Sequence, residues 1–85
     1  MVMLECCAVY DSAVEAYLTP LFVVHVGQAV RSFKDEASRE GSPIAAHPDH
    51  YDLYRIGSFD EQSGTLLALP KPALLCIGNS IRDSS

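Results

Sequence analysis

The densest group of polar side chains lies in HPDHYDLYRIGSFDEQSG, which runs from His47 to Gly64. Two histidines stand three residues apart in it, and imidazole nitrogens are common ligands of zinc. Histidine pairs that bind zinc from a helix are spaced four apart, and the proline between His47 and His50 favours a turn over a rigid ligand frame. We therefore expect no metal and no other cofactor here. In this interpretation Pro48 opens a single turn, and Asp49 stabilises its start.

The carboxylates of the same segment are not expected to form an acid–base pair. Asp60 and Glu61 belong to DEQSG, a sequence typical of a hairpin turn, while Asp52 alternates away from its strand neighbours. The chain also lacks a G-x-S-x-G motif and a glycine-rich phosphate loop. The sequence thus predicts that the protein is not an enzyme.

The cysteines and one further histidine are expected to be structural. Cys6, Cys7 and Cys76 are an odd number and a poor disulfide framework, so they are interpreted as reduced thiols that pack as small hydrophobes. In a strand, Cys6 and Cys7 point to opposite faces and cannot share one metal without a bend. His25 stands alone among valines and is expected to be a hydrogen-bonded strand residue rather than a ligand.

One group of basic and aromatic residues could bind nucleic acid. It combines Arg31 and Lys34 of a predicted helix with Arg55, Tyr51 and Tyr54 of a predicted strand, and Tyr17 is expected near by. Cations can follow a phosphate backbone while tyrosine rings stack on bases, as in proteins that bind single strands. In the alternative interpretation Arg31 pairs with the aspartate one turn on, and the tyrosines complete the rim of the core.

The first half of the chain predicts two strands and a helix. Residues 3–10 favour a strand, and residues 17–25 are aromatic and β-branched around Pro20, so this second strand begins after the proline or lies at an edge. From residue 26 the apolar residues follow the period of a helix, in one stripe: Val26, Val30, Phe33 and Ala37. The sequence GSP at 41–43 ends this helix.

The second half predicts a hairpin. Alternation over residues 51–59 predicts a strand with four residues on one side, provided that Gly57 makes no bulge: Tyr51, Leu53, Arg55 and Phe59. A type I turn with Gly64 in the left-handed conformation leads into the next strand. Two prolines at 70 and 72 are expected to end that strand, after which residues 73–78 add a short edge strand.

These elements predict an α+β fold, with a small antiparallel sheet of about four strands in the order β-β-α-β-β and one packed helix. Residues 1–78 are expected to form a single domain, and residues 79–85 a frayed polar tail. One helix covers only one face of a sheet, whereas apolar residues alternate onto both faces of the last strands. We therefore expect the other face to meet a second copy, in a homodimer or a higher homo-oligomer.

Composition and charge exclude several classes of protein. Hydrophobic residues make up 48% of the 85 residues, which is too apolar for a disordered chain. The longest stretch without charge, Ala16 to Val30, is too short and too polar to span a membrane, and the start MVMLECCAV does not resemble a signal peptide. The net charge of −5 restricts any nucleic-acid binding to a local patch.

Three blocks of the sequence resemble a known family: VYDSAVEAYLTPLF, GQAVRSF and HPDHYDLYRIGSFDEQSG. In this order and at these spacings they are similar to the small nonstructural protein of gokushoviruses, which are single-stranded DNA phages of the microvirus group. The likeness runs from about Val9 to Gly64. Its most specific block is HP-x-x-Y-x-L-x-x-x-G-x-F-D-x-x-x-G, made here by His47, Pro48, Tyr51, Leu53, Gly57, Phe59, Asp60 and Gly64.

The resemblance implies a DNA-binding accessory protein that acts in viral DNA replication, or at the switch to single-strand synthesis and packaging. Its expected partners are single-stranded DNA, a second copy of the chain and a viral or host replication protein, in the cytoplasm of the infected bacterium. The rival hypothesis is a protein-interaction or assembly factor without DNA contact, which the acidic balance favours. A third is a metal-dependent enzyme that uses His47, His50 and a cysteine.

Overall fold

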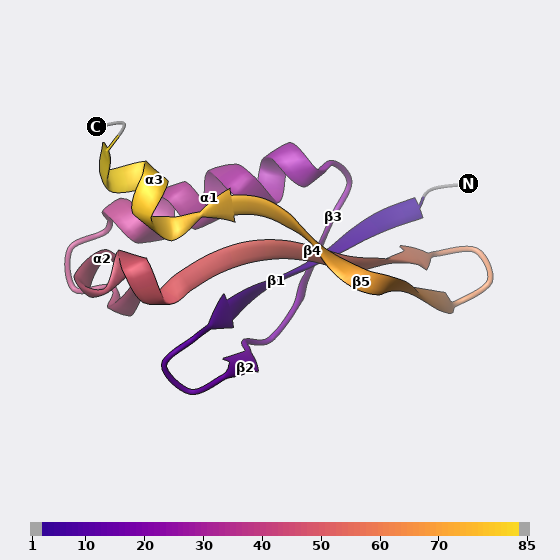
Figure 1. Ribbon diagram of the computed structural model, residues 1–85. Helices are drawn as coiled ribbons and strands as arrows, with labels where there is room; N and C mark the ends of the chain where they lie inside the picture. Colours follow the sequence, from indigo (N-terminus) through magenta and orange to yellow (C-terminus); the bar gives the residue numbers. More distant parts are fainter. Residues whose placement is uncertain (1–2, 84–85) are drawn as a thin grey trace.

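An antiparallel sheet forms the centre of the molecule, of which the computed structural model describes residues 3–83 (Figure 1). Its strands are β1 (Met3–Asp11), β2 (Ala16–Tyr17), β3 (Leu21–Val23), β4 (Tyr51–Asp60) and β5 (Thr65–Ile77). The order across the sheet is β2-β1-β4-β5, and β3 also pairs with β1. The remaining elements are α1 (Val26–Ser38), α2 (Pro43–Ala46), the 3-10 turn η1 (Pro48–His50) and α3 (Gly78–Asp83). The predicted α+β class is confirmed.

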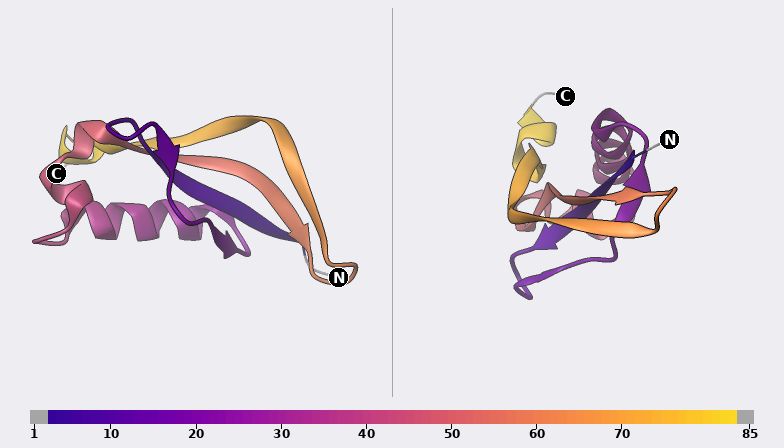
Figure 2. Two further views of the ribbon diagram at one scale, coloured as in Figure 1. Left: turned by 90° about the horizontal axis from the view of Figure 1, so that it is seen from below. Right: turned by 90° about the vertical axis from the view of Figure 1, so that its right-hand side faces the viewer.

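Helix α1 packs along one face of the sheet (Figure 2). The buried core joins β1, α1, α2 and β4 through Cys7, Ala29, Phe33, Ile44 and Leu53. Around this core, Val26, Val30 and Ala37 are half-buried, so the predicted apolar stripe of the helix is confirmed. The same view shows that the β4–β5 hairpin extends past the end of α1, which leaves the hairpin without a helical cover.

His25 begins the helix rather than ending a strand. Its Nδ1 accepts a hydrogen bond from the Gly27 backbone N–H at 3.0 Å, and the Gln28 side chain accepts one from the His25 N–H at 3.1 Å. This reciprocal arrangement is a capping box, which satisfies N–H groups that have no partner inside the helix. The prediction of a strand histidine is therefore wrong.

An irregularity in β4 reverses the expected side of Phe59. Cys7 lies opposite Arg55 and Cys6 opposite Gly57, so Ile56 is an extra residue in β4. Because side chains alternate with a period of two, one extra residue moves everything after it to the other face. Phe59 consequently shares the face turned away from α1, whereas Arg55 stays on the face of α1.

The prolines of β5 do not end the strand. It continues from Thr65 to Ile77, but its pairing with β4 skips from Ala68 to Ala73, so both prolines fall where the register is broken. Proline cannot donate to a ladder, and β5 tolerates it because it is an edge strand. The two predicted strands are therefore one bent strand.

Two segments expected to be irregular contain helical turns. The stretch after α1 forms α2, which begins at Pro43 and is capped by the Ser42 side chain, and then η1, which confirms the single turn predicted at Pro48. Residues 79–83, which were expected to belong to a frayed polar tail, continue α3 as far as Asp83. Residues 84–85 lie outside the described residues.

The turn between β4 and β5 contains the predicted left-handed glycine. Gly64 has a φ of 75°, and its N–H donates to the Asp60 carbonyl at 2.8 Å. A second hydrogen bond of 2.9 Å runs from the Gln62 N–H to the Asp60 side chain. A Cβ at residue 64 would meet nothing within 4 Å, so the requirement for glycine here is purely one of backbone conformation.

We expect Gly64→Val to lower the free energy of unfolding by about 1 kcal/mol or more, because a β-branched residue is penalised at positive φ. Gly64→Asn is the matched control, since asparagine tolerates the left-handed conformation. Urea denaturation of the two variants measures the difference. Equal midpoints would show that the turn does not require this conformation.

Candidate functional site

Three tyrosines gather on the far face, which we define as the sheet face turned away from α1. Tyr10 of β1 pairs with Tyr17 of β2, and their ring centroids lie 4.8 Å apart. Tyr54 of β4 stands edge-on to both rings, with centroid distances of 6.4 Å to Tyr10 and 5.9 Å to Tyr17. We call these residues the tyrosine cluster. Its outermost ring belongs to Tyr17, which is 44% exposed.

The phenol of Tyr54 is uncharged near neutral pH. Partial burial raises the pKa of Tyr54, and the nearby Asp52 carboxylate and the other two tyrosines raise this pKa further. Asp52 itself accepts a hydrogen bond of 3.1 Å from the Gly78 N–H at the start of α3. The phenol of Tyr54 thus stays protonated, and its neutral hydroxyl group lies beside the aromatic faces of the cluster.

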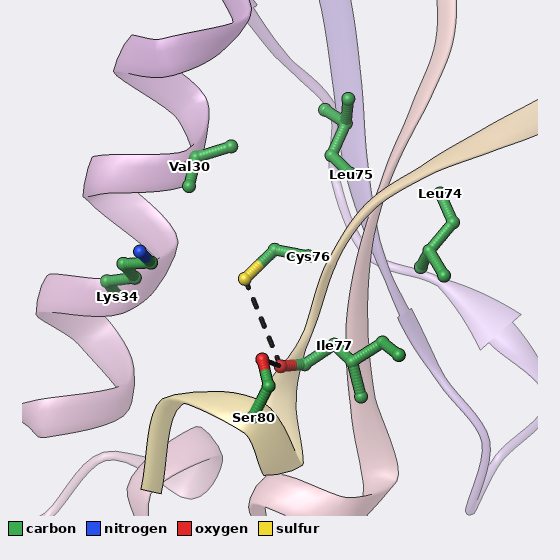
Figure 3. Close-up of a pocket in the computed structure, with 7 residues that line it drawn as sticks. All are labelled: Val30, Lys34, Leu74, Leu75, Cys76, Ile77 and Ser80. Atoms are coloured by element: carbon green, nitrogen blue, oxygen red, sulfur yellow. Dashed lines mark hydrogen bonds between the residues drawn. The ribbon is translucent and has the colours of Figure 1, made fainter. Parts of the chain in front are cut away.

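A groove runs between α1 and the last part of β5, with a volume of about 480 Å³ (Figure 3). We call it the α1–β5 groove, and its lining residues are Val30, Lys34, Leu74, Leu75, Cys76, Ile77 and Ser80. Figure 3 shows that Cys76 points from β5 towards α1, whereas Leu74 and Ile77 point away from it. Lys34 brings the one charged side chain among the described lining residues.

The structure brings together only part of the predicted binding group. Arg31 and Lys34 are exposed and lie three residues apart on α1. Tyr54 lies on the far face, and Leu74 of β5, its cross-strand neighbour, also lines the α1–β5 groove. Lys34 and Tyr54 are therefore on opposite sides of the edge strand β5.

Two predicted residues lie elsewhere, on the face of α1. The Arg55 guanidinium donates to the Glu5 carboxylate at 2.7 Å, which fixes it beside β1. Tyr51 packs against the core, and burial raises its pKa, with a further contribution from Asp11. Neither side chain joins the tyrosine cluster.

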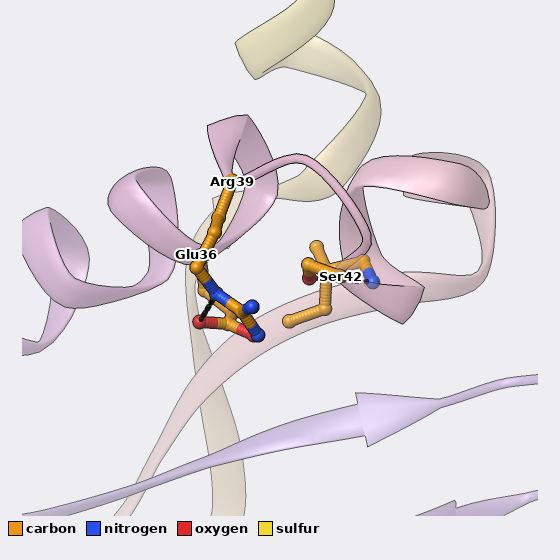
Figure 4. A network of polar contacts seen from close by, with 4 residues as sticks. Glu36, Arg39 and Ser42 are labelled. Carbon is orange, nitrogen blue, oxygen red and sulfur yellow. Dashed lines mark hydrogen bonds and ion pairs between the residues drawn. The ribbon is translucent and has the colours of Figure 1, made fainter.

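The ion pair at the end of α1 joins Arg39 to Glu36, whereas the alternative interpretation of the sequence paired Arg31 with Asp35. Arg39 donates to Glu36 through two nitrogens at 3.1 and 2.6 Å (Figure 4). This hydrogen bonding, more than the charge of Arg39, lowers the pKa of Glu36. A hydrogen bond from the Ser42 hydroxyl lowers the same pKa further. Within residues 3–83 no ion pair links Arg31 to Asp35.

Comparison with known proteins identifies the family of this chain. The family model described as "Phage ORF5 protein" matches residues 4–81, nearly the whole of the 85-residue chain. The chain belongs to this phage family. No curated protein and no solved structure matches it.

The prediction of a phage protein is thereby confirmed, and a Phage ORF5 protein is made in the infected host cell. The narrower resemblance to gokushoviruses, the contact with DNA and the replication role stay predictions. Within the described residues, no helix of this Phage ORF5 protein has the length and apolarity needed to cross a membrane.

The histidines and the cysteines of this chain do not form one group. The His47 and His50 rings stack at a centroid distance of 5.3 Å. In residues 3–83, no group of three or more histidines, cysteines or acids is arranged to hold a metal ion. Burial raises the pKa of the Cys6 and Cys7 thiols, and the neighbouring Cys6 and Glu5 raise that of Cys7 further. These thiols are accordingly protonated near neutral pH.

Sequence reasoning missed one feature of the far face. An apolar hollow of about 270 Å³ lies at the hairpin end, lined by Cys6, Pro20, Phe22, Ile56, Gly57, Leu66, Leu67 and Ala68. The alternation of apolar residues signalled an uncovered face. The hollow itself depends on the extra residue in β4, for which Gly57 was the one signal in the sequence, and on the bend of β5, which the sequence pattern did not show.

Proposed function

We propose that this Phage ORF5 protein is a non-enzymatic accessory protein that binds single-stranded DNA in the infected bacterium. In this proposal it acts in viral DNA replication, or in the switch to single-strand synthesis and packaging. The observation that supports the proposal best is the tyrosine cluster, because it presents a stacking surface on a face that α1 leaves uncovered.

The cluster is suited to stacking because its outer ring is both exposed and held in place. Tyr10 and Tyr54 contact the Tyr17 ring from two neighbouring strands, so little rotational freedom is lost when a base packs against it. Stacking of a base on an aromatic side chain contributes about 1–3 kcal/mol and tolerates any base. We therefore expect weak preference for sequence.

The phosphate contacts are assigned to α1. Because the chain has a net charge of −5, a strand of DNA must find a local pair of cations. Arg31 and Lys34 form such a pair, and Lys34 borders the α1–β5 groove. A strand that crosses the edge of β5 next to Leu74 would meet Lys34 on one side and Tyr54 on the other.

Arg55 and Tyr51 contribute less in this proposal than the sequence predicted. A phosphate could reach Arg55 only in competition with the Glu5 carboxylate. Tyr51 is packed against the core and offers no free ring face comparable with that of Tyr17. Both residues thus have a structural explanation in the described fold.

Titration of a labelled single strand at several salt concentrations tests the proposal. Arg31→Ala and Lys34→Ala should each reduce the slope of log affinity against log salt by roughly 0.7. Tyr17→Ala should weaken binding by about 1–3 kcal/mol at every salt concentration and leave the slope unchanged. Arg39→Ala removes the same charge from the C-cap of the same helix, but the side chain it removes is already paired with Glu36, so it serves as the control.

The alternative function is a protein-interaction or assembly factor without direct DNA contact. The acidic net charge supports it, since negative protein surface repels a phosphate backbone. In that case the labelled strand stays free even at low salt, and the variants of Arg31, Lys34 and Tyr17 behave like the parent protein. This outcome would replace the DNA-binding proposal.

A further inference from the structure

The apolar hollow lies at the opposite end of the far face from the tyrosine cluster. Its lining comes from β1, from Pro20 and the following strand β3, and from β4 and β5. Among the described lining residues there is no charged side chain. An engineered apolar cavity of about 150 Å³ admits benzene, so a hollow of about 270 Å³ has room for a branched aliphatic side chain. Its occupant should be apolar.

Apolar side chains also project at the rim of the hollow. Leu66 is 65% exposed and Phe22 46% exposed. Phe22 is held against Phe59, with ring centroids 5.8 Å apart, and Leu66 pairs with Phe59 across the β4–β5 ladder. A projecting leucine and a hollow that can take a leucine are therefore neighbours on a single patch.

We propose that this patch is the interface of a symmetric homodimer, in which Leu66 of each copy enters the hollow of the other. A two-fold interface joins the same patch on both copies, so it requires a surface that is complementary to itself. A projection and a recess side by side meet this requirement. The inference goes beyond the proposed DNA binding and does not depend on it.

The charge of the lining permits a second copy as the occupant. Two copies that each carry a net charge of −5 repel one another, so their contact must lie where few carboxylates meet. The described lining of the hollow contains no carboxylate. A standard interface covers about 800 Å² per partner, roughly a seventh of the 5444 Å² exposed by this chain, so the contact must extend from the hollow onto the neighbouring surface of the hairpin, which α1 leaves uncovered.

The contact is expected through the face of the hairpin rather than through the outer edge of β5. Edge-to-edge pairing would require a continuous row of backbone donors. Pro70 and Pro72 interrupt that row in the middle of β5, where the strand also loses its register with β4.

Analytical ultracentrifugation of the DNA-free protein at micromolar concentrations tests the proposal. The parent chain should sediment as a dimer, and Leu66→Asp should raise the dimer dissociation constant about 100-fold, because it places a carboxylate in an apolar recess. Val24→Asp adds the same charge at a valine that is also 65% exposed but does not line the hollow, and it should remain dimeric.

A milder variant separates a loss of dimerisation from a loss of folding. Leu66→Gln adds no charge and should still raise the dissociation constant at least tenfold, with an unchanged far-ultraviolet circular dichroism spectrum. A monomeric parent protein would overturn the proposal, and so would a folded Leu66→Asp variant that dimerises like the parent. Because DNA is absent, neither result depends on the outcome of the DNA-binding test.

Discussion

Replacing Gly57 with alanine should lower the free energy of unfolding by about 3 kcal/mol, a large share of what a domain of this size possesses. A Cβ at residue 57 would overlap the backbone carbonyl oxygen of Leu67 and press on the Cα of Ala68. Both are backbone atoms of the paired strand, so the clash cannot be relieved by rotating a side chain. Strands β4 and β5 would have to separate, at the place where Ile56 already disturbs their pairing.

Chemical denaturation measures this loss, and Ser58→Ala provides the control. Ser58 is the next residue of β4 and already carries a Cβ, so its substitution should change the free energy of unfolding by less than about 0.5 kcal/mol. If Gly57→Ala is as stable as Ser58→Ala, the close approach of β4 and β5 at this point is wrong.

Gly78→Ala should cost about 2–3 kcal/mol, for a related reason at the other end of the sheet. The added Cβ would overlap two backbone carbonyl oxygens, those of Pro48 and Tyr51. Gly78 also donates its N–H to Asp52, which ties the start of α3 to β4. Alanine would therefore displace α3 from η1 and break this hydrogen bond.

Asn79→Ala separates this effect from a general weakening of α3. Asn79 is exposed and is the next residue of the same helix, so its substitution should leave the melting temperature nearly unchanged. Thermal unfolding followed by circular dichroism compares the two variants. A Gly78→Ala protein that melts together with Asn79→Ala would show that α3 does not dock against η1.

The parts of the fold that follow from local rules were predictable. The stripe through Val30 and Phe33 has the period of a helix, and Gly64 is the residue that a left-handed turn position requires. The continuation of β5 through Pro70 and Pro72 was not predictable in the same way. It depends on β5 lying at the edge of the sheet, and strand order is set by long-range pairing rather than by local sequence.

In the candidate site, too, the features set by local sequence were predictable and those set by long-range pairing were not. Tyr54 and Arg55 are adjacent in the sequence, and the two-residue period of a strand already places them on opposite faces. The tyrosine cluster could not be predicted without knowing that Tyr10 pairs with Tyr17, and this pairing depends on the short strand β2. Phe22 and Leu66 come from distant parts of the chain, and only the assembled sheet brings both to one hollow.

The tyrosine cluster also gives this protein an optical probe of its own. The chain contains four tyrosines and no tryptophan, so tyrosine dominates its near-ultraviolet absorption and emission. Three of the four rings are in mutual contact. A base stacked on Tyr17 would quench this emission, whereas association through Leu66 takes place at the far end of the sheet. Unlabelled protein can thus report by its own fluorescence whether the tyrosine cluster is occupied, independently of association through Leu66.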